Sequence, residues 1–99
     1  ATAWCVPFQF EWDPEKAIAN FRKHGVTFWE ATEAFFDPLS ATTDDPAHSV
    51  EERRCWTIGL SRTGRLLVVS HTDRGGKIRI IGARRATRRE QQHHEEDPT

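Results

Sequence analysis

The sequence predicts an α+β domain in which helices and strands form separate blocks. Two segments with helical periodicity and capping signals fill residues 13–36. Three strand-like segments follow between residues 53 and 83, joined by turns too short to hold a crossover helix. We therefore expect two N-terminal helices packed on a mainly antiparallel sheet in two layers, with one further helix at the C-terminal end.

The length and composition are those of one small domain. The 99 residues are expected to form a single domain over 1–99, with its core at about 8–90 and tails at 1–7 and 95–99. No apolar run approaches the ~18 residues that cross a bilayer, so no membrane association is expected. Two Cys do not make a disulfide framework. These features favour a cytoplasmic protein.

The first helix follows a short strand at "FQFEW" (8–12), where apolar and polar residues alternate. Asp13 is a good N-cap, and Gly25 suits the left-handed stop. Within the segment between them, Ile18 and Phe21 share a face with Ala17, as in an amphipathic helix.

The second helix is predicted over "TFWEATEAFF" (27–36). Thr27 and Glu30 form a capping box at its start, and Pro38 ends it because the residue before proline avoids helical geometry. One stripe follows the i, i+3, i+4, i+7 pattern: Phe28, Ala31, Thr32 and Phe35.

The rest of the chain is expected to form a meander of strands. Residues 39–43 are a weaker strand candidate, whereas residues 53–61, 65–72 and 77–83 have strong strand character. The segment 65–72 is apolar on both faces, which is typical of a central strand. Residues 86–96 form a helix that is polar all round, and such a helix must dock or bind a partner to persist.

Alternation along the strands predicts which side chains share a face. In residues 52–60, one face would hold Glu52, Arg54, Trp56, Ile58 and Leu60. In the next strand, Leu67, Val69 and His71 share a face. In the last strand, Arg79, Ile81 and Ala83 would alternate with Ile78, Ile80, Gly82 and Arg84. An antiparallel meander would then gather these side chains near one part of the sheet: His48, Glu52, Arg54, His71, Arg79 and Arg84.

The net charge is −1, but the acidic and basic residues are distributed very unevenly along the chain. Residues 1–51 hold three Lys and Arg against nine Asp and Glu, whereas residues 62–89 hold nine against one. A basic half on a small domain suggests a polyanionic ligand such as nucleic acid. A surface that neutralises itself within the fold is the equal alternative on charge alone.

The charged and imidazole side chains suit the cleavage of RNA without a metal. In that reaction the 2′-OH attacks its own phosphate, so a base, an acid and a cation that stabilises the phosphorane are needed. His and Glu can transfer protons, and the Arg fork matches phosphate oxygens. The sequence offers all three residue types.

Plainer interpretations stay open for the same residues. His48 in a turn-forming loop is more often a turn residue, and residues 51–54 are more often a solvated charge run. Neither "DDPAH" (44–48) nor the His and Glu pairs at 93–96 has convincing ligand spacing, so no metal or other cofactor is expected. A non-catalytic binding module and a structural domain therefore remain alternatives to a ribonuclease.

Several motifs occur together in one order: "FEWDPEKAIANFRKHGVTFWEA" (10–31), "FFDP" (35–38), "HSVEERRCWTIG" (48–59) and "RLLVVSHTDRGGKIRIIGARRATRRE" (65–90). Over about residues 10–90 the chain resembles the BrnT family of bacterial toxins. The resemblance implies a RelE-like fold and a metal-independent endoribonuclease that halts translation. It also implies neutralisation by a BrnA-like antitoxin with a ribbon-helix-helix part, in a heterotetramer with a toxin dimer.

The resemblance, the strand pattern and the basic segment together give the residues expected to act. The expected catalytic residues are His48, Glu52, Arg54, Arg79 and Arg84. The residues expected to bind RNA are Lys23, His24, His71, Arg74 and Arg85. Two departures from the family matter: Gly82 stands where Ser is frequent, and the chain has no Tyr for acid–base chemistry or stacking.

Overall fold

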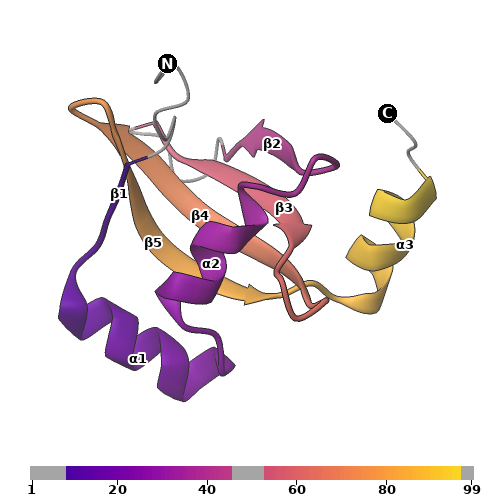
Figure 1. Ribbon diagram of the computed structural model, residues 1–99, viewed down its shortest axis with the longest axis horizontal. Helices are drawn as coiled ribbons and strands as arrows, with labels where there is room; N and C mark the ends of the chain where they lie inside the picture. The colour runs from indigo at the N-terminus through magenta and orange to yellow at the C-terminus, as the bar shows by residue number, and fades with distance from the viewer. Residues whose placement is uncertain (1–8, 46–52, 97–99) are drawn as a thin grey trace, which may run out of the picture.

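A computed structural model describes residues 9–45 and 53–96 (Figure 1). Its elements are, in chain order, β1 (Phe10–Glu11), α1 (Pro14–His24), α2 (Phe28–Ala34), β2 (Ala41–Asp44), β3 (Cys55–Leu60), β4 (Leu66–Arg74), β5 (Lys77–Arg85) and α3 (Arg88–Glu96). The strands form one mixed sheet in the order β1-β5-β4-β3-β2, in which only the β1–β5 pair is parallel. The predicted α+β class and the central place of β4 are confirmed.

In the part of the chain that the structure describes, the helices α1 and α2 cover one face of the sheet. Figure 1 shows α1 and α2 on the same side, whereas α3 lies apart, beyond the end of β5. The main core lies between this helix pair and the sheet: Val26, Phe28, Ala31, Ala34, Leu67, Val69, Ile80 and Ala83. A small second cluster lies on the opposite face: Leu66, Val68 and Ala86, with Ile58 against them. We call this second side the open face.

The helix boundaries follow the local signals in the sequence. The Asp13 side chain accepts a hydrogen bond from the Glu15 amide at 2.9 Å, and Gly25 ends α1 in the left-handed region with φ 72°. The Thr27 hydroxyl accepts a hydrogen bond from the Glu30 amide at 3.0 Å, which starts α2. These predicted caps are confirmed.

The predicted apolar face of α1 is packed only in part, with Ala17 against the core. Ile18 and Phe21 are 55% and 53% exposed, and none of the residues of α1 is buried. The core is filled by α2, which fits so closely that a β-carbon at Gly59 would collide with the carbonyl oxygen of Ala34. The first helix instead lies along β5 and docks through smaller side chains.

A bulge in β5 changes which of its residues share a face. Ser70 pairs with Gly82, but His71 pairs with Ile80, so Ile81 is an extra residue in the ladder. Strict alternation had grouped Arg79 with Ala83, and that assignment is wrong. The inserted residue lets both Ile80 and Ala83 enter the core, and it turns Arg79 to the open face that also carries Arg84.

An ion pair ties α2 to the turn between β3 and β4. The Glu30 carboxylate accepts hydrogen bonds from Nε and the terminal Nη2 of Arg65 and from the hydroxyls of Ser61 and Thr63. The pKa of Glu30 falls to about 2, chiefly because of the hydrogen bond from Arg65. The hydrogen bonds from the two hydroxyls lower this pKa further. The carboxylate is mostly buried, so the interaction fixes the helix pair on the sheet.

Glu30→Gln should lower the free energy of unfolding at pH 7 by about 1.5–3 kcal/mol, because the hydrogen bonds lose their charged acceptor. A lowered pKa stabilises the fold above the unfolded value of 4.5, and this contribution disappears as the pH falls towards about 2. Urea unfolding should therefore give a lower free energy of unfolding for Glu30→Gln than for the parent at pH 7. The difference should become small in acid. Glu15→Gln, on exposed α1, is the control and should change stability by less than about 0.5 kcal/mol. An equal stability of Glu30→Gln and the parent at pH 7 would contradict this account.

Candidate active site

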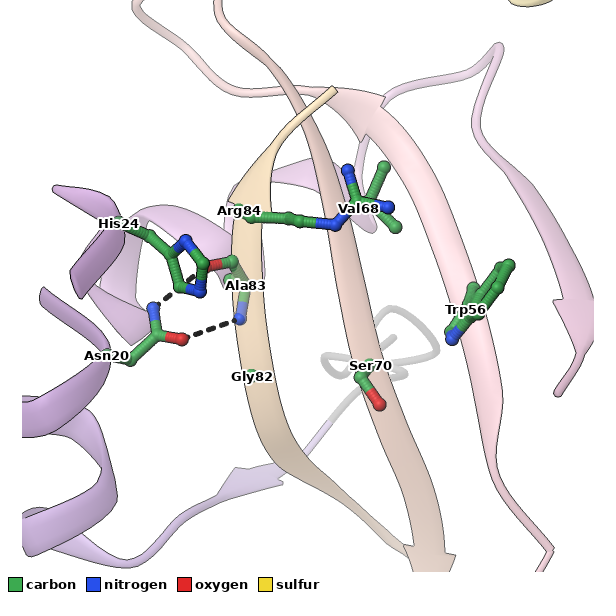
Figure 2. A pocket seen from close by; sticks show the side chains of 8 residues that line it. All are labelled: Asn20, His24, Trp56, Val68, Ser70, Gly82, Ala83 and Arg84. Atoms are coloured by element: carbon green, nitrogen blue, oxygen red, sulfur yellow. Dashed lines mark hydrogen bonds between the residues drawn. The ribbon is translucent and has the colours of Figure 1, made fainter. Parts of the chain in front are cut away.

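A shallow hollow of about 190 Å³ crosses the open face of the sheet next to the C-terminal end of α1 (Figure 2). Figure 2 shows its lining residues: Asn20, His24, Trp56, Val68, Ser70, Gly82, Ala83 and Arg84. They come from α1, β3, β4 and β5, so the tertiary fold assembles the site from segments far apart in the chain.

The strand register explains why the sheet is hollow at this point. Trp56 pairs with Ser70, and Ser70 pairs with Gly82, so these three residues form one row across β3, β4 and β5. Ser70 and Gly82 have small side chains, so the surface of the sheet is lower there than at the neighbouring indole of Trp56. In the adjacent row Val68 pairs with Arg84, whose side chain extends from β5 over β4 (Figure 2).

Asn20 joins α1 to the free edge of β5. Its Nδ2 donates to the carbonyl oxygens of Ala83 at 2.8 Å and Val26 at 3.0 Å, and its Oδ1 accepts from the Ala83 amide at 3.1 Å. In the described ranges β1 pairs with β5 at Ile78 and Arg79, and further along β5 the Asn20 amide makes the hydrogen bonds to Ala83 that a neighbouring strand would otherwise make. Residues four apart lie on the same helix face, so Asn20 also places His24 at the rim of the hollow.

Arg84 is held by a carboxylate from α3. Its two terminal nitrogens donate to the two carboxylate oxygens of Glu90 at 2.9 and 3.0 Å, a paired geometry that fixes the guanidinium plane. Glu90 also accepts from the Thr87 amide at 2.8 Å, while the Glu90 amide donates to the Thr87 hydroxyl at 3.1 Å. The Arg84 hydrogen bond is the main reason that the pKa of Glu90 falls to about 2. One carboxylate therefore caps α3 and orients the cation of the hollow.

Three more of the expected residues lie near this region of the fold. Arg79 is on the same face as Arg84, and its NH1 donates to a Glu11 carboxylate oxygen at 3.2 Å. Arg54 directly precedes β3, and its carbonyl oxygen accepts from the Asp45 amide at 2.9 Å. Lys23 is exposed beside His24, at the end of α1.

The structure places other expected residues away from the hollow. Arg74 is exposed at the end of β4, by the hairpin turn, and Arg85 is exposed at the end of β5. His48 and Glu52 lie outside the described residues.

His71 is separated from the open face by the sheet itself. Its ring packs against Phe35 with centroids 4.9 Å apart, and its Nε2 lies 2.8 Å from the Thr57 hydroxyl. The side chain is only 6% exposed, and burial lowers its pKa, so the neutral imidazole is favoured. In this position His71 supports the core and does not line the hollow with Arg84.

Of the eight lining residues, only His24 and Arg84 had been singled out from the sequence as site residues, and the most informative of the others are Trp56 and Asn20. The alternation along β3 already put Trp56 on the same face as the expected cations, and this was the available signal. Asn20 gave no signal, because nothing in a helical pattern shows that a side chain will bond to a strand 63 residues later. Among the residues that the structure describes, we find no cluster of three His, Cys, Asp or Glu side chains that could hold a metal ion.

The fold and the site define a small α+β protein with a cationic hollow on an open sheet. The family described as the ribonuclease toxin BrnT of type II toxin–antitoxin systems matches residues 12–90, and the chain belongs to this family. The crystal structure of the Brucella abortus ribonuclease toxin BrnT is similar in fold, with a TM-score of 0.62 and 23% identity over 82% of this chain and 99% of that one. No curated protein matches the sequence. None of the helices in the described part of the chain is long and apolar enough to cross a membrane.

Glu90→Gln should loosen α3, because the amide cannot replace the charged partner of Arg84. We expect amide exchange in the first turns of α3 to become roughly fivefold faster, the effect of losing about 1 kcal/mol from a helix cap. Hydrogen exchange with mass or NMR detection measures this directly. Gln92→Ala, at an exposed position of the same helix, should leave exchange in these turns nearly unchanged. If Glu90→Gln exchanges like the parent, the Arg84 pair does not hold the helix.

Proposed function

We propose that this protein is a metal-independent endoribonuclease that cuts single-stranded RNA in the hollow of the open face. The observation that carries the proposal is the joint presence of Arg84 and His24 around a floor of small residues. Arg offers a planar fork that matches phosphate oxygens, and His can give or take a proton near neutral pH. These are the groups that phosphodiester cleavage needs.

The proposed reaction is an internal transesterification. The 2′ oxygen attacks the adjacent phosphorus, so the O2′–P bond forms and the P–O5′ bond breaks. The products are a 2′,3′-cyclic phosphate and a free 5′-OH. A base accepts the 2′-OH proton, and an acid protonates the leaving O5′. Arg84 stabilises the charge of the phosphorane, as preorganised donors do in other active sites.

We assign one proton transfer to His24, which lines the hollow. His48 and Glu52 remain the candidates for the second transfer on the grounds of sequence alone. Arg79 and Arg54 would attract the flanking phosphates, together with Lys23, Arg74 and Arg85 at the surface. His71 is not included in the site because it is buried on the other face.

The donor set of the hollow favours a mechanism without a metal. Among the described residues that line it there is no Asp or Glu, whereas the metal ions of phosphoryl chemistry are held mainly by carboxylate and other oxygen ligands. The Glu90 carboxylate, which pairs with Arg84, is also bonded to the Thr87 amide.

Membership of a type II toxin–antitoxin family implies an antitoxin partner. We propose that this partner is BrnA-like, with a ribbon-helix-helix part, and that it binds a toxin dimer in a heterotetramer. We also propose that the free toxin acts in the cytoplasm and halts translation by cutting RNA. Co-expression of a neighbouring ribbon-helix-helix gene should then reverse the growth arrest that the toxin causes.

Purified protein should cut a single-stranded RNA in excess EDTA, because the proposed groups need no metal. Products should carry 2′,3′-cyclic phosphate ends, and a 2′-deoxy nucleotide at the cleavage position should block cutting there. Gel analysis with mass spectrometry of the ends measures both features. RNA left intact in EDTA but cut with Mg²⁺ would refute metal independence, and cutting beside the 2′-deoxy nucleotide would refute the internal attack.

Arg84→Ala should lower the cleavage rate by about 10²–10³-fold, the loss typical of one transition-state donor. His24→Ala should lower it by about 10²–10⁴-fold, as for a general acid or base. Arg62→Ala removes an exposed Arg outside the hollow and should cut at nearly the parental rate. Unchanged rates in well-folded Arg84→Ala and His24→Ala would show that the hollow is not the active site. His48→Ala and Glu52→Gln test the second proton transfer in the same assay.

A further inference from the structure

Trp56 has a position in the sheet that packing does not explain. It is a strand residue in a five-stranded sheet, yet its side chain is 39% exposed. It is not part of either apolar cluster. Within the described part of the chain, no ring contact involves Trp56, whereas Trp12 and Trp29 pack edge to face with centroids 4.9 Å apart. The largest side chain on the open face therefore has a free ring surface.

The surroundings of Trp56 make that surface accessible to a flat group. Towards β4 and β5, its row continues with Ser70 and Gly82, which leave space next to the indole. Strands about 4.8 Å apart put Trp56 and Gly82 about 10 Å from each other across the sheet. Arg84 lies in the adjacent row at the far side of the same hollow. One nucleotide can therefore touch both the indole and the guanidinium.

We infer that Trp56 is the stacking platform for an unpaired nucleobase next to the phosphate that Arg84 binds. An exposed aromatic ring on a strand face, with a cation nearby, is the arrangement by which proteins hold single-stranded nucleic acid. Stacking on the ring accepts every base, so this site favours single strands over duplexes and discriminates weakly among bases. The inference rests on the proposed function, because it uses the same hollow for RNA.

A single-stranded oligodeoxynucleotide tests the inference, since it lacks the 2′-OH and stays intact. Its dissociation constant should be measured by fluorescence anisotropy for the parent, Trp56→Leu and Trp56→Phe. Leu keeps an apolar side chain but has no ring, so affinity should fall about tenfold, whereas Phe should lose less than about threefold. Trp29→Leu is the matched control: Trp29 is 73% exposed but does not line the hollow, and its affinity should equal that of the parent.

An oligomer of the same length made of abasic sites keeps the phosphates and removes the bases. The parent should bind it about tenfold more weakly than the normal strand, and Trp56→Leu should show little further loss. Equal affinities of Trp56→Leu and the parent, or of the abasic and normal strands, would overturn the inference and leave the indole as a contact for a protein partner.

The outcome also separates the inference from the proposed function. If the parent cuts RNA but substitution of Trp56 does not change the dissociation constant for the strand, only the stacking inference fails. If binding depends on Trp56 but RNA is not cut, stacking stands and the nuclease proposal fails. If the parent neither binds the strand nor cuts RNA, both fail.

Discussion

The arrangement of the described residues depends on a sheet whose main core lies on one face, under the first two helices. Phe28, Ala31 and Ala34 of α2 close that face, and side chains of β4 and β5 meet them there. The bulge at Ile81 makes this compatible with function, because it lets Ile80 and Ala83 both enter the core while Arg79 and Arg84 point to the other side. Without the extra residue, period-two alternation would force one of these sets into the wrong environment. The same β4–β5 register therefore determines which side chains enter the core and which lie at the candidate site.

Contacts within the fold account for part of the charge asymmetry of the chain. Arg65 pairs with Glu30 and Arg79 pairs with Glu11, so the basic half is neutralised in part by the acidic half. The pair between Arg84 and Glu90 is different, because it lies at the hollow and both partners come from the C-terminal part of the chain. If Arg84 binds phosphate as proposed, such a pair would hold its guanidinium in one plane beforehand and lower the cost of ordering it. Pairing within the fold thus explains the charges of Arg65 and Arg79, whereas Arg84 is the cation that we propose for phosphate binding.

Local signals were sufficient for most of the fold, and non-local contacts account for what the sequence did not show. The caps at Asp13, Gly25 and Thr27 act within a few residues and were predictable, as were the strands. The bulge at Ile81 depends on pairing between two strands, so alternation along one strand could not show it. Burial also depends on partners: Ile18 and Phe21 have a helical pattern but no facing surface, while His71 lies under Phe35. For the site, the sequence supplied Arg84 and His24, but their meeting depends on the bond from Asn20 to Ala83.

We propose that RNA binds on the open face of the sheet and not on the helix layer. A titration of ¹⁵N-labelled protein with a non-cleavable single-stranded oligonucleotide, followed by backbone and indole NMR signals, tests this directly. The largest shifts are expected at Trp56, Ser70, Gly82 and His24, and the indole signal of Trp29 should stay in place. Shifts that concentrate on α2 and the exposed faces of α1, with the hollow unchanged, would contradict it.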